Sequence, residues 1–366
     1  MTAPTQDRTP ATGAPGPVRK SESLTHGQLS VNTRRGILVG SVVVGVGAVL
    51  LMGWGINPVG MIAVSALLYG LVVYIASRAV EGPRQAADRL TTAVVTSFFL
   101  LAMVPLVSLI ITVVEKGTGR FDIAFFTESM RGVIGEGGGA YHAIMGTLIV
   151  TAIATAVSVP IGILSAIYLV EYGNKNRLSR ALTFFVDVMT GIPSIVAGLF
   201  AFALFSLILG DPGARAGIIG AAALIVLMIP TVVRNTEEML RVVPMELREA
   251  AYALGVPKWL TITKVVLRTA IAGIATGVTI AIARIIGETA PLLVTVGITT
   301  GVNLNPFSGR MATLPVFSYY QYMTPGVPPE PFIERAWTAA LVLMIIVMTL
   351  NLIARAISHY FAPKAR

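Results

Sequence analysis

Two opposite charges interrupt one of the longest apolar stretches of the chain, and they point most directly to a chemical role. Arg284 and Glu288 lie four residues apart within the apolar run 269–297. In a continuous helix this spacing places both side chains on one face, where they can form an ion pair. An ionisable side chain at bilayer depth costs at least about 2.5 kcal/mol on insertion scales, so such residues by default indicate a functional site.

Two interpretations of Arg284 and Glu288 are consistent with the sequence. In the first, the two charges neutralise each other in a structural contact between helices. In the second, they line a polar path, and the arginine offers two parallel N–H donors to an oxyanion. Glu288 would then hold Arg284 in position while the path is empty, or accept a proton from the bound oxyanion.

The apolar run 181–209 contains a predicted break. Pro193 removes a helix hydrogen bond and Gly191 permits the close approach of a neighbour, so a helix through this run should kink or break. Carbonyl groups freed by the break, or the hydroxyl of Ser194, could line the same path, although a purely structural kink fits equally well. Asp187, about 10 Å from the inner end of the run, is expected to serve packing or the inner mouth.

The composition places these residues in a membrane protein. The chain has 366 residues, of which 55% are hydrophobic and only 12% are charged, whereas soluble domains carry about 25% charged residues. There is no cysteine, which excludes disulfides and thiolate metal sites. The net charge of +9 fits basic loops on the cytoplasmic side of a membrane better than nucleic-acid binding. We therefore predict an all-α polytopic membrane protein.

No set of residues forms a pattern typical of catalysis or metal binding. The three histidines, His26, His142 and His359, are isolated and show no metal-ligand spacing. The glycine-rich segment 135–139 lacks the lysine of a phosphate-binding P-loop, so we interpret it as a flexible outer loop. The sequence predicts neither a catalytic residue nor a metal site.

Eight apolar runs are long enough to cross a hydrocarbon core of about 30 Å. They cover approximately residues 37–55, 59–77, 93–114, 143–170, 181–209, 215–233, 269–297 and 336–357. A turn signal at 55–58 joins the first two into a hairpin. The predicted parts are a disordered cytoplasmic tail at 1–35, a transmembrane hairpin at 36–77, a cytoplasmic linker at 78–92, a core at 93–358 with a cytoplasmic loop at 234–268, and a C-terminal tail at 359–366.

The distribution of basic residues orients these spans. With both termini in the cytoplasm, 20 of the 27 Lys and Arg residues fall in inner segments and six fall in outer segments, while Arg284 lies within a span. This asymmetry follows the positive-inside rule. Arg234 ends the run 215–233 at its inner side, and we interpret it as a basic anchor at the membrane surface.

The largest inner loop, 234–268, is predicted to contain two short helices. Pro244 can open the first one, and Gly255 suits the left-handed residue that ends it. One apolar stripe runs along this helix, formed by Leu247, Ala250, Ala251 and Leu254. An apolar stripe exposed to water needs a partner, which is either another protein or the membrane surface.

The residues of this loop resemble a known motif. Glu249-Ala250-Ala251, followed after three residues by Gly255, resembles the EAA loop of ABC-importer permeases. Several wider segments resemble the permeases of phosphate-specific ABC importers, namely 191–196, 235–240, 243–244, 247–255 and 283–293. The ending GETAPLL at 287–293 and the segment 351–355 are similar to the A subunit rather than the C subunit. The resemblance covers roughly 93–358, and the N-terminal hairpin departs from the six-helix core of these permeases.

The resemblance implies a fold, partners and a substrate. The fold would be a six-helix type I ABC-importer permease core, extended by an N-terminal transmembrane hairpin, in a bacterial cytoplasmic membrane. The partners would be a second homologous permease (PstC-like), two ATPase subunits that carry ATP and Mg, an extracytoplasmic phosphate-binding protein, and membrane lipid. The chain itself would be a transport subunit for inorganic phosphate, not an enzyme. It would need no cofactor and bind no nucleic acid.

The resemblance also assigns roles to individual residues. Contact with the ATPase would involve Glu249, Ala250, Ala251 and Gly255. The substrate path would include Arg284, Glu288, Thr289, Pro193 and Ser194. Two alternatives are a permease of the same class for another oxyanion, such as sulfate, molybdate or phosphonate, and an ATP-independent transporter or channel. The EAA-type loop argues against the second alternative.

Overall fold

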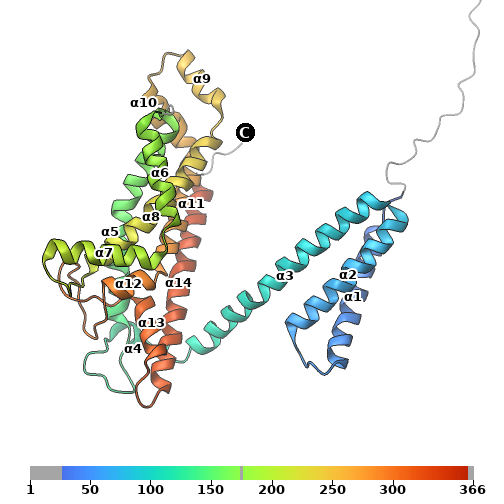
Figure 1. Cartoon of the computed structure of the whole chain (residues 1–366), viewed down its shortest axis with the longest axis horizontal. Helices are drawn as coiled ribbons and strands as arrows, with labels where there is room; N and C mark the ends of the chain where they lie inside the picture. Colours follow the sequence, from blue (N-terminus) through green and yellow to red (C-terminus); the bar gives the residue numbers. More distant parts are fainter. Residues whose placement is uncertain (1–26, 174–175, 362–366) are drawn as a thin grey trace, which may run out of the picture. The chain divides into compact units, whose positions relative to one another are not determined.

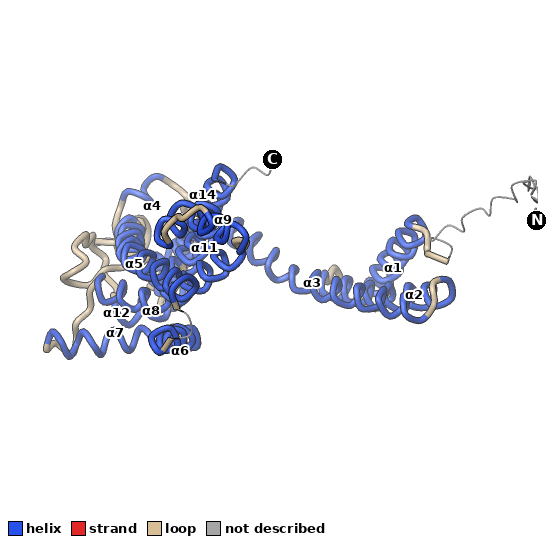
Figure 2. The backbone as a smooth tube through the Cα atoms, turned by 90° about the horizontal axis from the view of Figure 1, so that it is seen from above, coloured by secondary structure: helices blue, strands red, loops and turns tan. Residues whose placement is uncertain are grey.

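The computed structural model describes residues 27–173 and 176–361, and within these ranges the chain is helical and contains no β-strand. The chain divides into two compact units, and the division falls between Ile110 and Ile111. Figure 1 labels the helices, and Figure 2 shows that loops connect them. The prediction of an all-α protein is therefore confirmed for the part of the chain that the structure describes.

Seven helices among the described residues are long and apolar enough to cross a membrane, and a bent helix pair adds a possible eighth span. The seven are α1 (Val31–Leu51), α2 (Pro58–Val80), α3 (Pro83–Gly117), α5 (Tyr141–Ile167) with the π-helical η1 (Tyr168–Tyr172), α8 (Gly217–Val242), the run of α10 (Lys258–Thr261), η2 (Ile262–Val266) and α11 (Leu267–Ile286), and α14 (Glu330–Phe361). The bent pair is α6 (Arg177–Gly191) and α7 (Ser194–Leu209). The remaining short helices are α4 (Ile123–Thr127), α9 (Met245–Ala253), α12 (Ala290–Thr295) and α13 (Leu314–Met323).

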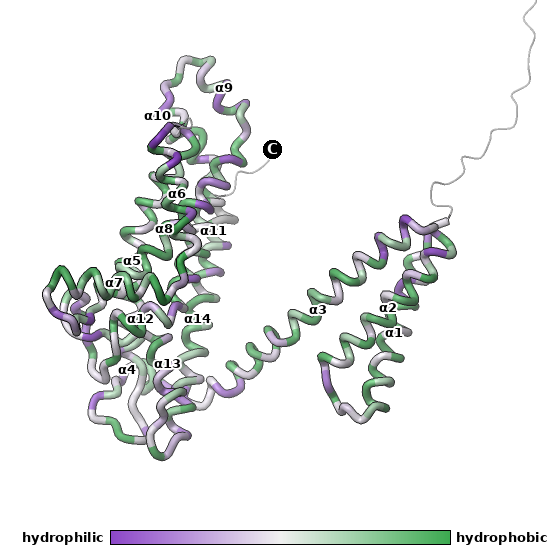
Figure 3. The backbone as a smooth tube through the Cα atoms, viewed as in Figure 1, coloured by the Kyte–Doolittle hydropathy of each residue, from purple (hydrophilic) through white to green (hydrophobic). Residues whose placement is uncertain are grey.

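Figure 3 shows that apolar residues dominate along the long helices and that hydrophilic residues gather at α9, at α10 and in the loops, as a polytopic membrane protein requires.

The first helix begins inside the segment that the sequence analysis predicts to be a disordered tail. Helix α1 begins at Val31, because the hydroxyl of Ser30 caps it by accepting a hydrogen bond from the backbone N–H of Thr33 (3.1 Å). The prediction of disorder over 1–35 is therefore wrong at its C-terminal end. The segment 1–26 lies outside the described residues.

The predicted linker 78–92 is almost entirely helical. Helix α2 continues to Val80 and α3 starts at Pro83, which leaves only two residues between them. Proline is well suited to the first helical position because its missing N–H would have no partner there. At the other end of the chain, α14 runs to Phe361, into the predicted C-terminal tail, and 362–366 lie outside the described residues.

The N-terminal unit consists of the α1–α2 hairpin and the first part of α3. Helices α1 and α2 pack closely, whereas α3 packs less closely against either of them. Gly45 permits the close contact, since a Cβ at this position would lie 2.3 Å from the hydroxyl oxygen of Ser65 on α2. This unit is therefore a tight helix pair with a third helix set against it more loosely.

A buried carboxylate joins the ends of these three helices. The side chain of Glu81 is only 1% exposed. Its Oε1 accepts a hydrogen bond from the backbone N–H of Leu29 (2.8 Å), and its Oε2 accepts from the hydroxyl of Ser77 and from Nε of Arg89 (3.5 Å). The hydrogen bond from Ser77 is the largest cause that lowers the pKa of Glu81 below its usual value. Glu81 therefore stays ionised and holds the beginning of α1, the end of α2 and the beginning of α3 together.

In the second unit, α5 and α8 form the central pair. Gly162 on α5 lies so close to α8 that a Cβ would meet Cγ1 of Val232 at 2.6 Å. Helix α11 packs against α8 and α14, and both Figure 1 and Figure 2 show α5, α8 and α11 side by side. The main hydrophobic cluster fills the space between these helices, with fully buried Val150, Leu224 and Met228 among its members. This packed cluster fixes the positions of the polar residues described below.

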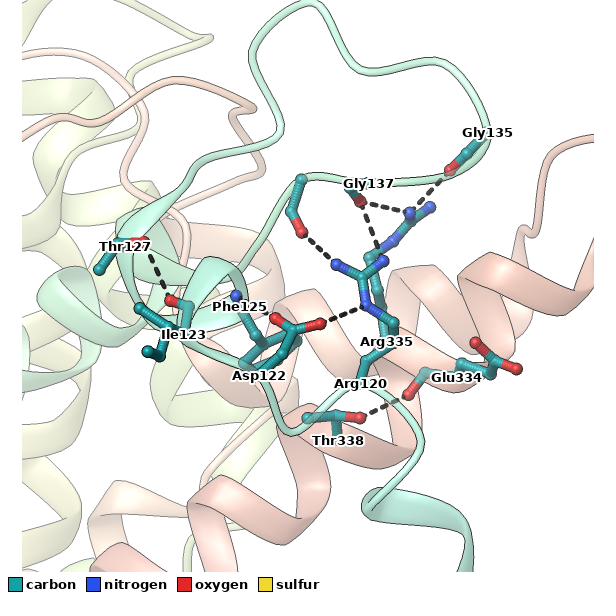
Figure 4. A network of polar contacts seen from close by, with 11 residues as sticks. Arg120, Asp122, Ile123, Phe125, Thr127, Gly135, Gly137, Glu334, Arg335 and Thr338 are labelled. Atoms are coloured by element: carbon teal, nitrogen blue, oxygen red, sulfur yellow. Dashed lines mark hydrogen bonds and ion pairs between the residues drawn. The ribbon is translucent and has the colours of Figure 1, made fainter.

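Two arginines hold the glycine-rich outer loop that the sequence predicts to be flexible (Figure 4). The fully buried Arg335 on α14 donates from Nη1 to the carbonyl oxygens of Gly135 (2.7 Å) and Gly137 (2.9 Å). Arg120 donates from Nη2 to the carbonyl oxygen of Gly138 (3.0 Å). Because three of its carbonyl groups are tied to arginines, the loop has a defined backbone at these glycines.

We expect Arg335→Leu to lower the free energy of unfolding by about 2 kcal/mol or more, because hydrogen bonds from a charged donor contribute about 1.5–3 kcal/mol each. The variant should melt at a lower temperature in detergent and should be cleaved more rapidly in the outer loop by protease. The control is Glu334→Gln, which changes the exposed neighbour on α14. Equal melting temperatures and cleavage rates for the two variants would contradict this account.

Candidate functional site

The predicted break in the run 181–209 is present. Helix α6 ends at Gly191, α7 begins at Ser194, and the two helices are bent by 109° with respect to each other. Pro193 occupies the N-cap position of α7, where it can donate no hydrogen bond to the end of α6. The prediction that this run kinks or breaks is therefore confirmed.

The close approach expected at Gly191 occurs instead at Gly198. A Cβ at Gly191 would meet no atom within 4 Å, so this glycine does not serve helix contact within the chain. A Cβ at Gly198 on α7 would lie 2.6 Å from Cα of Pro291 on α12. Gly198 therefore allows α7 to lie directly against α12.

A second break separates Arg284 from Glu288 and overturns the prediction that they share a helix face. Helix α11 ends at Ile286, Gly287 is its C-cap, and α12 starts only at Ala290. Proline at position 291 has no N–H for the carbonyl of Gly287, so the helix cannot continue unchanged through this segment. Arg284 thus lies in the last turn of α11, whereas Glu288 and Thr289 lie in the turn that follows.

Arg284 lines a pocket of about 200 Å³ at the first break. The pocket is formed by the end of α6, the middle of α8 and the end of α11, and its lining includes Thr190, Thr231, Arg234 and Asn235. Nη1 of Arg284 lies 3.5 Å from the hydroxyl oxygen of Thr231. Within the described ranges no carboxylate lies within ion-pair distance of this guanidinium, which is exposed to the pocket.

The other arginine of the pocket has carboxylate partners. Arg234 contacts Asp187 on α6 and donates from Nη1 to Oε2 of Glu237 (3.1 Å), and Arg241 contacts Oε1 of Glu237 (2.5 Å). Helix α8 continues past Arg234 to Val242, so Arg234 lies within the helix and not at its end. Asp187 faces this network and does not pair with Arg284. The network neutralises Arg234 and leaves Arg284 as the cation of the pocket without an acidic partner in the described part of the chain.

The predicted path residues do not all come together. Among them, Arg284 lines the pocket, whereas Pro193, Ser194, Glu288 and Thr289 do not. Thr231 and Asn235, which the sequence analysis did not select, line it instead, and Nδ2 of Asn235 donates to the carbonyl oxygen of Gly277 (3.2 Å). Thr231 and Asn235 lie three residues before and one residue after Arg234 on α8, and this proximity in the sequence was the signal that could have identified them. The hydroxyls of Thr190 and Thr231 donate to the carbonyl oxygens of Val186 and Leu227, so the guanidinium of Arg284 is the donor of this pocket best suited to bind an anion.

The inner loop has the predicted helix, and its ends agree with the sequence. Helix α9 spans Met245–Ala253, Pro244 is its N-cap, and Gly255 has a φ of +75°. The apolar side chains of Leu247, Tyr252 and Leu254 are exposed by 42%, 42% and 83%. Of the residues implied to contact an ATPase, Glu249, Ala250 and Gly255 are exposed, whereas Ala251 is buried.

The opposite face of α9 is fixed by an ion pair that the sequence did not reveal. Nη2 of the buried Arg248 lies 2.8 Å from Oε1 of Glu171 in η1, and Nε of Arg248 lies 3.2 Å from the same oxygen. Arg248 also donates from Nη2 to the carbonyl oxygen of Leu240 (2.9 Å) and from Nη1 to that of Val243 (2.6 Å). Glu171 lies 77 residues before Arg248, so no local pattern links the two. This contact attaches α9 to η1, which follows α5, and to the end of α8.

Comparison with known proteins identifies the class to which this arrangement belongs. A family model described as "Binding-protein-dependent transport system inner membrane component" matches residues 158–366, which is more than half of the chain. The chain belongs to this family. It is a multi-pass cytoplasmic-membrane protein and a transport component of an ABC importer rather than an enzyme, and it works with other subunits of such a system.

Individual relatives of the chain have more specific names than the family model. The phosphate transport system permease protein PstA 1 of Mycobacterium tuberculosis (strain H37Rv) is 46% identical over 285 residues, which cover 76% of this chain and 90% of the relative. PstA of Mycobacterium leprae is 45% identical, with 76% and 91% covered, and PstA of Yersinia pestis is 36% identical, with 77% and 92% covered. Among solved structures, the MetNI methionine ABC transporter in an inward-facing conformation is 20% identical, with a TM-score of 0.48, and the match covers 62% of this chain and 95% of that chain.

We expect Gly198→Val to disturb the contact between α7 and α12, because a side chain at this position must push α12 away from α7. Thermal stability in detergent should fall, and overpacking of this kind costs about 1–3 kcal/mol. The matched control is Gly191→Val, which adds the same side chain seven residues earlier at a position where a Cβ would meet no atom within 4 Å. A Gly198 variant as stable as the Gly191 variant would show that the close approach of α7 and α12 is not required.

Proposed function

We propose that the chain is the transmembrane permease subunit of an ATP-driven importer that moves inorganic phosphate into the cytoplasm. The observation that carries this proposal is the guanidinium of Arg284, which lies in a pocket between broken helices without a carboxylate partner among the described residues. An arginine of this kind can present parallel N–H donors to an oxyanion. The relatives at up to 46% identity, which carry the name of phosphate transport permeases, support phosphate as that oxyanion.

In the proposed mechanism, Arg284 donates hydrogen bonds to phosphate oxygens. The hydroxyl of Thr231, which donates to the carbonyl oxygen of Leu227 (3.4 Å) in this structure, would rotate to donate to the phosphate beside Arg284. Glu288 and Thr289 lie in the turn that directly follows Arg284, so both belong to the proposed path. Glu288 would accept the proton that phosphate, unlike sulfate, still carries near neutral pH. Pro193 and Ser194 contribute by creating the break at which the pocket opens.

The energy for transport comes from partner subunits in this proposal. An ATPase dimer, which carries ATP and Mg, docks on the exposed face of α9 around Glu249, Ala250 and Leu254. A second homologous permease (PstC-like) completes the transmembrane path, and an extracytoplasmic binding protein delivers phosphate. Both termini lie in the cytoplasm, as the 20-to-6 distribution of basic residues favours. The exposed apolar side chains on α9 supply the surface that such docking needs.

We expect Arg284→Gln to reduce the uptake of radiolabelled phosphate by about tenfold or more, because at least one charge-assisted hydrogen bond to the substrate is lost. Arg284→Lys, which keeps the charge but loses the planar fork, should retain an intermediate rate. Arg268→Gln removes an exposed arginine from the same helix and serves as the control. Near-normal uptake by Arg284→Gln at normal membrane abundance would refute the role of Arg284.

A second variant tests the docking of the ATPase. Gly255→Val places a β-branched residue at a φ of +75°, which costs about 1–3 kcal/mol and distorts the end of α9. We expect ATPase co-purification to fall while the permease still enters the membrane. Gly53→Val introduces the same strain, also at a φ of +75°, in the turn between α1 and α2 and should leave co-purification unchanged. Equal co-purification by both variants would contradict docking at α9.

A further inference from the structure

The N-terminal unit contains a groove of about 420 Å³ between α1, α2 and α3. This volume lies within the range of pockets that bind small molecules. Helix α1 lines the groove with Arg34, Leu38, Val42 and Val46, which recur every four residues and form one stripe along about 18 Å of helix. The groove exists because α3 packs less closely against the hairpin than α1 and α2 pack against each other.

One end of the groove is basic and has an unsatisfied donor. Arg34 and Arg89 both line this end. The Nε of Arg34 is buried and has no hydrogen-bond partner within the described residues. Glu81 does not pair with it: the carboxylate accepts hydrogen bonds from Leu29, Ser77 and Arg89, and its ion-pair partner is Arg89. The guanidinium of Arg34 is therefore available to an anion that enters the groove.

The rest of the groove is apolar, and its length fits one leaflet of a membrane. Half of a hydrocarbon core of about 30 Å is about 15 Å, close to the 18 Å stripe on α1. The far end of the groove is lined by Met61 and Leu100. The basic residues of the described part of this unit all lie at the opposite end, namely Arg34, Arg35, Arg78, Arg84 and Arg89. The positive-inside rule assigns that end to the cytoplasm.

We propose that this groove binds a phospholipid with an anionic headgroup from the cytoplasmic leaflet. The lipid phosphate accepts hydrogen bonds from Arg34 near Arg89, and an acyl chain lies along Leu38, Val42 and Val46. Basic pockets between membrane helices on the cytoplasmic side suit anionic headgroups in this way. Free phosphate would leave the apolar walls unfilled, so the two-part character of the groove favours a lipid.

A neighbouring pocket in the same unit differs from this groove in having no charged lining residue. It has a volume of about 240 Å³, lies between α2 and α3, and is lined by apolar residues such as Leu67 and Phe98 and by no charged residue. Such a pocket can accept an acyl chain but cannot distinguish one headgroup from another. Preference for an anionic lipid is therefore a property of the first groove and depends on Arg34.

The test uses the full-length chain purified in detergent and two lipids with identical acyl chains, phosphatidylglycerol and phosphatidylcholine. Native mass spectrometry measures how much of each lipid is retained. We expect the wild-type chain to retain phosphatidylglycerol preferentially, and Arg34→Gln to lower this retention by about fivefold or more, the effect of one basic side chain beside an anionic lipid. Arg35→Gln, which removes the same charge from the exposed neighbour outside the groove, should retain phosphatidylglycerol like the wild type.

A variant that fills the groove tests the acyl-chain part separately. Val42→Phe places a ring in this groove and not in the neighbouring pocket, and we expect it to lose the preferentially retained lipid while the arginines remain. Millimolar inorganic phosphate should not displace phosphatidylglycerol from the wild-type chain. Equal losses in Arg34→Gln and Arg35→Gln would show general charge attraction and overturn the proposal. Equal retention of both lipids by the wild type, displacement by phosphate, or unchanged retention in Val42→Phe would overturn it as well.

Discussion

In a hydrocarbon environment every backbone N–H and C=O group needs a partner within the protein, so a membrane helix can break only where protein or a polar cavity surrounds the break. This chain breaks two of its apolar runs, between α6 and α7 and between α11 and α12. The two broken segments meet, because α7 packs against α12 at Gly198 and Pro291. The rest of the core, with α5 against α8 and α11 against α8 and α14, holds this junction in place.

The low dielectric constant of the protein interior also explains which arginines have hydrogen-bond acceptors and which do not. An unpaired buried charge is costly, so arginines that serve structure are satisfied by carbonyl or carboxylate oxygens. Arg335 donates to the outer loop, Arg248 to Glu171 and to the end of α8, and Arg234 to Asp187 and Glu237. Arg284 has only the hydroxyl of Thr231 within the described residues, and this difference makes it the candidate for a mobile anion.

The geometry of α8 connects the pocket to the inner loop. One continuous helix carries Thr231 and Arg234 at the pocket and extends to Val242, just before α9. Arg248 then reaches back from α9 to the carbonyl oxygen of Leu240 near the end of α8 and to Glu171 beyond α5. Helix α9 is therefore connected to the two central helices of the core by direct hydrogen bonds as well as by the chain itself. In the proposed importer, this connection would carry the movement of the ATPase to the pocket.

The helices of the N-terminal unit are packed differently from those of the core. Its helices are joined at one end by the buried carboxylate of Glu81, and α3 is otherwise set loosely against the hairpin. The loose packing leaves apolar surface inside the unit, which lipid is well suited to cover. The family model, which matches 158–366, does not extend to this unit.

The sequence by itself determined the features that depend on local order. Apolar runs of sufficient length gave the spans, the missing N–H of Pro193 gave the break after α6, and Gly255 gave the left-handed end of α9. Each of these effects acts within a few residues of its cause, so one sequence is enough to predict it. The resemblance of short motifs to a permease family had the same local basis.

Only the tertiary structure decided which charges meet. Spacing alone suggested that Arg284 pairs with Glu288, but the break at Gly287 separates them, and the pocket joins Arg284 to Thr231, which lies 53 residues away. Likewise, Arg248 meets Glu171 across 77 residues, and Arg335 meets the carbonyl of Gly135 across 200 residues. Helical periodicity places a side chain on a face but does not say which helix covers that face. That choice depends on how the whole set of helices packs, which no local pattern contains.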